Sequence, residues 1–108
     1  MSRPHEAQYI QFMRKNKGRQ EVNLTYEEFL YFTTFLQCHY CGVRLNWNKV
    51  GRYNLDRMDN DEGYNFKNIV PCCTDCNRGK GSIYSYAEWV VMTIALRKYR
   101  RQLGRPIL

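Results

Sequence analysis

Apolar residues recur at helical spacing in three stretches of the chain, and residues typical of a helix start precede each stretch. Residues 3–15 are expected to form the first helix, because Pro4 suits a first turn and an apolar face follows. Residues 26–37 are expected to form the second, since Thr25 and Glu28 can form a capping box in which each side chain satisfies an otherwise unpaired amide.

The third predicted helix spans about 86–103 and begins at a second capping box, formed by Ser85 and Glu88. Its apolar residues recur in steps of three and four and form one stripe, which we expect to face the core. The stripe consists of Trp89, Met92, Leu96, Tyr99 and Leu103. Basic residues crowd the end of this helix, where they can stabilise its C-terminus or contact phosphates. They are Arg97, Lys98, Arg100, Arg101 and Arg105.

The region between the second and third helices has short extended runs separated by turn residues. Strands are predicted at Tyr53–Met58 and Ile69–Pro71, with turn chemistry over Asp59–Gly63. A short helix is expected over residues 74–80, with Thr74 as its N-cap. The pattern therefore predicts a small α+β fold in a single domain, residues 1–108.

The composition fits a small domain that would benefit from a metal. The chain has 108 residues, 44% of them apolar, so its core is modest. The net charge of +7 is compatible with a nucleic-acid partner, and equally with a solubilising surface. No apolar run is long enough for a membrane span, and the N-terminus lacks the apolar stretch of a signal peptide. We therefore expect an intracellular, cytoplasmic protein, in which cysteines favour metal over disulfides.

The five cysteines include two CxxC pairs, Cys38/Cys41 and Cys73/Cys76. Two residues between cysteines let both sulfurs reach one tetrahedral ion, so two pairs complete a closed structural zinc site. The fifth, Cys72, could replace Cys73, but the spacing to Cys76 favours Cys73 and leaves Cys72 as a buried thiol. His39 lies inside the first pair and is expected to be an exposed turn residue. Thirty-one residues separate Cys41 from Cys73, so a folded insert must lie between the pairs.

The insert and the second pair carry three sequence motifs in a distinctive order. LDRxD covers residues 55–59, GYxxxN covers 63–68, and CxxCNxxKG covers 73–81. Together with the first CxxC pair, this order resembles the HNH endonuclease family, in particular its zinc-stapled members of phage and mobile-element type. The resemblance covers residues 38–81. It implies a ββα-metal (His-Me finger) core, flanked here by N-terminal helices within 3–37 and by the helix over 86–103.

The resemblance also implies the roles of individual residues. Asp56 and Asn77 would hold a catalytic Mg²⁺ (or Mn²⁺), because both supply the oxygen ligands that such ions prefer. Asn68 would be the middle motif residue, which in the family mainly holds the loop between the strands. Three residues would contact nucleic acid. They are Arg57, Arg78 and Lys80.

Position 57 departs from the family pattern, because arginine replaces the histidine that acts as general base. Arginine has no acceptor and is not deprotonated in proteins. One account is that Arg57 holds a phosphate bidentately, while the metal, Asp59 or bulk hydroxide activates the water. Sequences with Asp-Arg at this point form a branch of the family. The other account is that cleavage was lost and binding was kept.

The favoured function is a metal-dependent HNH endonuclease that hydrolyses phosphodiester bonds in DNA, with RNA as an open alternative substrate. Further phosphate attraction would come from basic residues outside the motifs. They are Arg14, Lys15, Lys17 and Arg19, with the basic C-terminus. The competing interpretation is a non-catalytic zinc-ribbon module that binds nucleic acid or a protein. Four acids near the motif favour the enzyme, because a cation could lie among them. They are Asp56, Asp59, Asp61 and Glu62.

Overall fold

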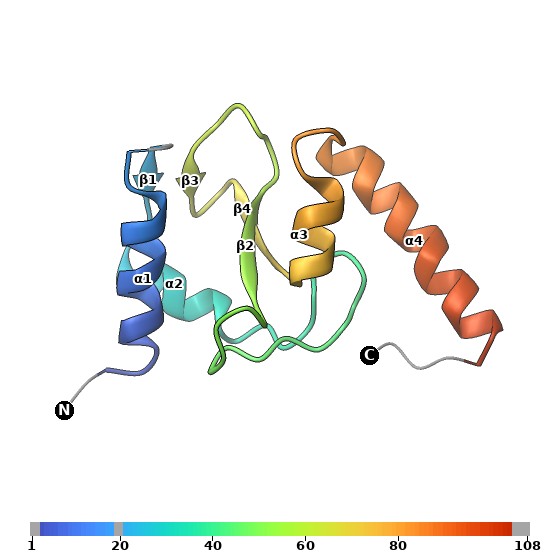
Figure 1. Cartoon of the computed structure of the whole chain (residues 1–108), viewed down its shortest axis with the longest axis horizontal. Coiled ribbons are helices and arrows are strands. Elements are labelled where there is room, and N and C mark those ends of the chain that lie inside the picture. Colours follow the sequence, from blue (N-terminus) through green and yellow to red (C-terminus); the bar gives the residue numbers. More distant parts are fainter. Residues whose placement is uncertain (1–2, 19–20, 105–108) are drawn as a thin grey trace.

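The computed structural model describes residues 3–18 and 21–104, which form an α+β fold of four helices and two two-stranded sheets (Figure 1). The predicted fold class is confirmed. In chain order the elements are α1 (Glu6–Asn16), β1 (Val22–Asn23), α2 (Tyr26–Phe32), β2 (Asn54–Arg57), β3 (Tyr64–Asn65), β4 (Ile69–Cys72), α3 (Thr74–Lys80) and α4 (Tyr86–Gln102). Arg19 and Arg105, two of the expected phosphate contacts, lie outside the described residues.

The centre of the molecule is a unit of two strands and one helix, formed by β2, β4 and α3, which we call the ββα unit (Figure 1). β2 pairs antiparallel with β4, with Asn54 opposite Cys72 and Arg57 opposite Ile69. All four residues of β4 are buried, so this strand shows no alternation of apolar and polar positions. α3 packs on β2. Both predicted strands are therefore present.

An aromatic cluster between α1, α2 and the loop before β2 forms the core on the N-terminal side. Its central ring belongs to Phe29, which is fully buried. The rings of Tyr9, Phe12 and Trp47 surround it at centroid distances of 5.6, 6.0 and 6.2 Å. Two polar tips are satisfied by backbone oxygens: Tyr9 Oη donates to Leu24 O at 2.7 Å, and Trp47 Nε1 donates to Phe35 O at 2.7 Å. The cluster thereby packs α1 and α2 against each other and against the loop that leads to β2.

A small parallel sheet that the sequence did not predict joins the N-terminal region to the hairpin loop. β1 pairs with β3, with Val22 opposite Tyr64. Tyr64 N donates to Glu21 O at 2.7 Å, so the chain at Gly63 passes very close to that oxygen. A Cβ at position 63 would lie 2.3 Å from Glu21 O, which explains why glycine occupies this position.

The predicted second helix is correct at its start but wrong at its end. Thr25 and Glu28 form the expected capping box, yet α2 ends at Phe32 rather than near Gln37. The hydroxyls of Thr33 and Thr34 donate to backbone oxygens one turn back and end the helix. The chain then becomes extended, because Gln37 forms a β-bridge with Arg44 across the first CxxC turn. Gln37 therefore pairs with Arg44 beside the first CxxC turn instead of continuing the helix.

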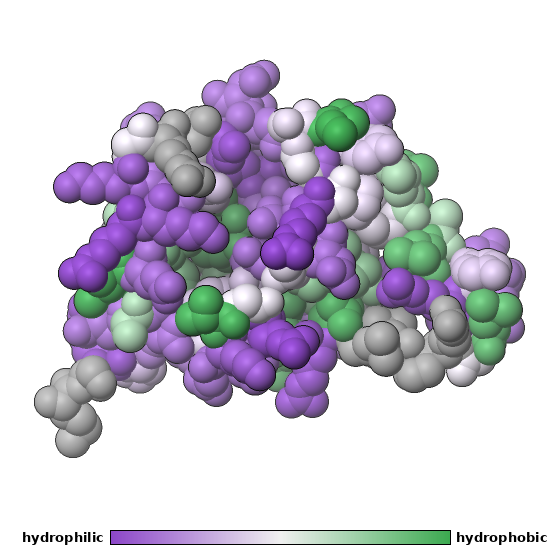
Figure 2. Space-filling model, viewed as in Figure 1, coloured by the Kyte–Doolittle hydropathy of each residue, from purple (hydrophilic) through white to green (hydrophobic). Residues whose placement is uncertain are grey.

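The apolar stripe of α4 does not face the core, which corrects the prediction. Thr93 is the buried residue of this helix, with Tyr86, Trp89, Val90 and Arg97 half-buried beside it. Of the predicted stripe, Met92, Leu96, Tyr99 and Leu103 are exposed, as are neighbouring Val91 and Ile94. Figure 2 shows apolar side chains gathering along this helix. The pattern identified an apolar face, but no described element covers it.

Trp89 of α4 contacts α3. Its ring lies against Gly79, where a Cβ would approach the ring to 2.7 Å.

No helix in the described part of the chain is long and apolar enough to cross a membrane.

Candidate zinc centre and polar cluster

The four predicted zinc ligands meet at one point, although they come from two regions of the chain. Cys38 and Cys41 form the turn after α2, while Cys73 and Cys76 form the junction of β4 and α3. Their sulfurs all lie within 4.8 Å of one another, and Cys41 Sγ is 3.7 Å from Cys73 Sγ. Zinc–thiolate bonds of about 2.3 Å in a tetrahedron require sulfurs roughly 3.8 Å apart. The cluster therefore fits a structural zinc ion.

Backbone amides point at the sulfurs in both turns. Cys41 N–H donates to Cys38 Sγ at 3.5 Å, and Cys76 N–H donates to Cys73 Sγ at 3.4 Å. Hydrogen bonds from neighbouring sulfurs lower the pKa of Cys38, and the hydrogen bond with Cys38 raises the pKa of Cys76. Four crowded thiols cannot all ionise by themselves, and a divalent cation provides the charge that stabilises four thiolates together.

The N-cap of α3 is Cys73 and not Thr74, which corrects the sequence prediction. Cys73 has extended backbone angles, and its sulfur accepts from the third amide of the helix. Thr74 is instead the first helical residue, and its hydroxyl donates to Gly51 O at 2.7 Å. The sulfur that caps the helix is therefore also one of the four sulfurs of the cluster that fits zinc.

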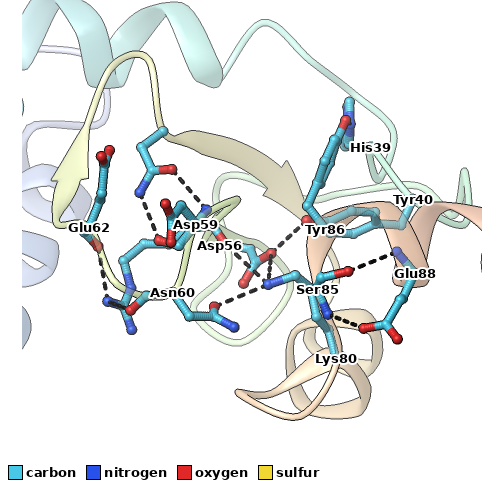
Figure 3. A network of polar contacts seen from close by, with 12 residues as sticks. His39, Tyr40, Asp56, Asp59, Asn60, Glu62, Lys80, Ser85, Tyr86 and Glu88 are labelled. Carbon is cyan, nitrogen blue, oxygen red and sulfur yellow. Dashed lines mark hydrogen bonds and ion pairs between the residues drawn. The ribbon is translucent and has the colours of Figure 1, made fainter.

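The remaining two residues near the zinc centre lie as expected. Cys72 is fully buried outside the sulfur cluster, and burial raises the pKa of its thiol. His39 is exposed and not part of the cluster. Its Nε2 lies 2.6 Å from Tyr86 Oη, and the two rings stack. His39 thereby connects the first CxxC turn with the start of α4 (Figure 3).

Asp56 lies in a buried polar cluster beside the zinc centre (Figure 3). Its Oδ2 accepts from Tyr40 Oη at 2.6 Å and lies 3.3 Å from Lys80 Nζ. Burial, and then the bond to Asp56, raise the pKa of Tyr40, so its hydroxyl stays protonated and acts as the donor. One carboxylate oxygen is thus held from two sides, by a neutral and a charged donor.

Lys80 is fully buried, so it does not lie at a surface where it could meet a phosphate. Besides Asp56, its ammonium group donates to Arg57 O at 3.1 Å and Asn60 Oδ1 at 3.2 Å. All three donors of an ammonium group therefore have partners. The predicted nucleic-acid contact at Lys80 is corrected accordingly: this residue binds Asp56, the backbone oxygen at the end of β2 and the Asn60 side chain.

Asn77 lies one helical turn before Lys80 on α3 and contacts the same strand. Its Nδ2 lies 3.5 Å from Asn54 Oδ1, while Asn54 Nδ2 donates to Thr74 Oγ1 at 2.9 Å. Asn54 and Asp56 are two residues apart on β2, so both face α3. Asn77 and Asp56 therefore lie on the same strand–helix interface in neighbouring positions. No hydrogen bond joins these two side chains directly in the part of the chain described.

Arg57 points away from that interface, toward the loop after β2. Its Nη1 donates to Asn60 O at 2.9 Å and Glu62 O at 3.1 Å, and its guanidinium lies over the ring of Tyr64 at 5.2 Å. Its Nε and Nη2 make no hydrogen bond within the described residues. Arg57 thus uses one nitrogen to hold the loop and keeps a planar pair of donors for a ligand.

Asn68 holds the loop that joins the two strands of the hairpin. It is buried, and its Nδ2 donates to Asp59 O at 3.1 Å and Gly63 O at 2.9 Å. Its Oδ1 accepts from Asp59 N at 2.9 Å. The side chain of Asp59 is exposed, and its Oδ1 accepts from Asp61 N at 2.9 Å. The loop-holding contacts expected of Asn68 are therefore present.

Comparison with protein-family models yields no match, and comparison with curated proteins yields none either. Among solved structures, the chain is similar to the rare-cutting HNH restriction endonuclease PacI, which is described as exhibiting a mechanism of DNA perturbation. The TM-score is 0.70 at 27% sequence identity, and the match covers 93% of this chain and 80% of that chain. The chain has an HNH endonuclease fold. The resemblance found in the motifs is confirmed, and the similarity supports a nuclease function.

Within this HNH fold, the four acids near the motif do not gather around a common point. Asp56 is paired with Lys80, whereas Asp59, Asp61 and Glu62 are exposed in the loop. The four cysteines form the only cluster of three or more cysteine, histidine or acidic side chains found in the described residues. The acids therefore do not by themselves indicate a cation among them.

Two residues of the site were not singled out from the sequence. Tyr40 occupies a variable position of the first CxxC turn, and Asn54 lies two residues before Asp56. The sequence offered one signal for them: Tyr40 lies between two predicted zinc ligands, and Asn54 shares a strand face with Asp56. Their partners, Asp56 and Asn77, are 16 and 23 residues away in sequence, and only the folded chain pairs them.

We predict that the natively purified protein contains one zinc per chain. Cys76→Ser removes one thiolate and is expected to lower zinc to less than about half an equivalent by elemental analysis. Cys72→Ala is the matched control, because it removes a buried thiol outside the cluster. Full zinc in Cys76→Ser, or loss in Cys72→Ala, would contradict the ligand assignment.

Lys80→Met is expected to destabilise the protein by about 3–5 kcal/mol, because it leaves the Asp56 carboxylate buried without its counter-charge. The free energy of unfolding is measured by urea denaturation with zinc retained. Lys67→Met, at an exposed lysine, serves as the control and changes it by less than about 0.5 kcal/mol. The double variant Asp56→Asn with Lys80→Met regains part of the loss. Equal stability of both single lysine variants would contradict a structural ion pair.

Proposed function

We propose that the chain is a metal-dependent HNH-type endonuclease that hydrolyses phosphodiester bonds in DNA. The observation that carries this proposal is the ββα unit in an HNH fold, with Asp56 of β2 and Asn77 of α3 on one strand–helix interface. Carboxylate and amide oxygens are the ligand types that Mg²⁺ or Mn²⁺ prefers. A bound ion would polarise the scissile phosphate and stabilise charge on the leaving 3′ oxygen.

The residues around this interface support distinct roles. Arg57 has Nε and Nη2 available for a phosphate, and Arg78 is exposed on α3 next to Asn77. Asn68 keeps the hairpin loop, and with it the end of β2, in a fixed position. Asp59 is the carboxylate closest in sequence to Arg57 that remains exposed, so it stays a candidate for accepting the proton of the attacking water.

Arginine at position 57 cannot act as the general base, so the proton must go elsewhere. Two routes fit the chemistry: Asp59 accepts it directly, or the pKa of the attacking water is lowered by the bound ion. The first route can use Asp59 Oδ2, because within the described residues only Oδ1 of this carboxylate accepts a hydrogen bond, from Asp61 N–H. The second route needs no carboxylate as proton acceptor.

One observation favours the competing function, a non-catalytic zinc module that binds nucleic acid. Asp56 is already neutralised by Lys80, and a carboxylate with a counter-charge attracts a divalent ion less strongly. For the chain to be an enzyme, the second carboxylate oxygen of Asp56 and the side-chain oxygen of Asn77 must suffice to bind the divalent ion. Cleavage and DNA binding must therefore be measured separately.

We expect the wild-type protein, with zinc retained, to nick supercoiled plasmid in the presence of Mg²⁺ or Mn²⁺ and not in a mild chelator. Asn77→Ala and Asp56→Asn are expected to lower the nicking rate by on the order of 100-fold or more, because the first removes an oxygen ligand and the second removes the negative charge of the carboxylate ligand. Asn48→Ala, at an exposed asparagine, is the matched control. Unchanged nicking in both site variants, or no metal-dependent nicking by the wild type, would defeat the proposal.

Arg57→Ala is expected to weaken DNA binding by about tenfold at fixed salt, with unchanged zinc content, because a bidentate phosphate contact is lost. Arg57→Lys should restore the charge but only part of the affinity, since lysine lacks the planar pair of donors. Affinity is measured by fluorescence anisotropy with a short labelled duplex. An affinity in Arg57→Ala equal to that of the wild type would rule out the phosphate contact.

A further inference from the structure

A cleft of about 440 Å³ opens between α1 on one side and β2 with α3 on the other. In Figure 1 these elements lie side by side, with α1 and α3 on either side of β2. The volume falls in the range of roughly 300–1,000 Å³ that is typical of ligand sites. Residues from both walls line it, among them Gln8, Gln11, Asn16, Tyr53, Asn77 and Arg78.

The lining combines amides, aromatic rings and cations, and it includes no Asp or Glu. Its aromatic and apolar side chains include Phe12, Phe29, Leu55 and Tyr64. Lys15 from α1 and Arg78 from α3 contribute positive charge from opposite walls. A surface without carboxylates and with two cations suits an anionic ligand, while the rings suit a flat apolar one. A nucleotide has both properties.

Several hydrogen-bonding groups in the cleft are free to meet a ligand. The Asn16 side chain is buried and donates from Nδ2 to Phe12 O at 2.9 Å, which leaves its Oδ1 as an acceptor. Gln11 is exposed on α1, and its amide makes no hydrogen bond within the described residues. Tyr53 is held in place by stacking on Trp47, with ring centroids 4.8 Å apart. The cleft therefore offers a rigid ring beside uncommitted amide groups.

A base that is paired in a duplex cannot use this cleft. Its Watson–Crick edge faces the partner strand, and both of its flat faces are covered by the neighbouring base pairs of the stack. An unpaired base exposes its Watson–Crick edge to hydrogen bonds from side-chain amides, and it exposes both flat faces for stacking. The chemistry of the lining thus favours a single base outside the stack.

The geometry points to this cleft as the binding site for one unpaired nucleobase of the DNA strand, next to the phosphate at Asn77. The inference rests on the proposed function, because Asn77 lines the cleft and is also a proposed metal ligand. α1 would then contribute to substrate binding, although it lies outside the motifs of the HNH resemblance. Gln11 and Asn16 would contact the base edge, and Tyr53 would provide the adjacent ring.

The test measures binding without a divalent ion, so that no cleavage occurs. Three short duplexes are compared at fixed salt with zinc-loaded full-length protein: one fully paired, one with a single unpaired adenine, and one with an unpaired site that lacks its base. We expect the unpaired adenine to raise affinity by about tenfold over the paired duplex, and the baseless site to lose this gain. Equal affinity for the adenine and baseless duplexes overturns the inference.

Gln11→Ala locates the effect within the molecule. It should reduce the gain from the unpaired adenine to about twofold, because a base-edge contact is lost, while affinity for the paired duplex stays the same. Gln102→Ala, on the exposed surface of α4, is the matched control and should keep the full gain. A full gain in Gln11→Ala overturns the assignment to this cleft.

These outcomes are separate from those of the nicking assay. A base-dependent gain without metal-dependent nicking supports the cleft and defeats the nuclease proposal. Nicking by the wild type with no base-dependent gain supports the nuclease proposal and defeats the cleft.

Discussion

The bond on which the rest of the site depends is the one between the sulfur of Cys73 and the amide of Cys76. That sulfur belongs to the zinc cluster and also caps α3, a helix of seven residues that is too short to be stable alone in water. The four-cysteine cluster therefore fixes where α3 begins, and with it the direction in which Asn77 points. A zinc ion held by the four cysteines would be structural, yet its effect would reach the proposed catalytic residues within one helical turn.

The other end of α3 is fixed by a buried charge. Lys80, its last residue, binds Asp56 of β2, the backbone after it, and Asn60 in the hairpin loop. A lone buried ammonium would be costly, but here every donor has a partner. The same contact lowers the negative charge that Asp56 offers to a cation. Stability of the strand–helix interface and strength of metal binding thus oppose each other at one carboxylate.

Local signals in the sequence predicted most of the ββα unit and little of what surrounds it. CxxC spacing, turn residues and capping boxes act over a few residues, so the four-cysteine cluster, both strands of the hairpin and the starts of α2, α3 and α4 were predicted correctly. The first helix, predicted over residues 3–15 without a capping box, instead spans Glu6–Asn16. The burial of Lys80 depends on a partner 24 residues away, which no local pattern reveals. The α4 stripe shows a different limit: periodicity identifies which face is apolar, but not whether another element covers it. The early end of α2 likewise follows from the bridge between Gln37 and Arg44.

The contact between Gly79 and Trp89 has a mechanical consequence for the molecule. Because a glycine on α3 lies directly against an indole ring on α4, there is no flexible side chain between the two helices at that point. A residue larger than glycine at position 79 would have to move Trp89, and with it the start of α4, at a point only two residues along α3 from Asn77.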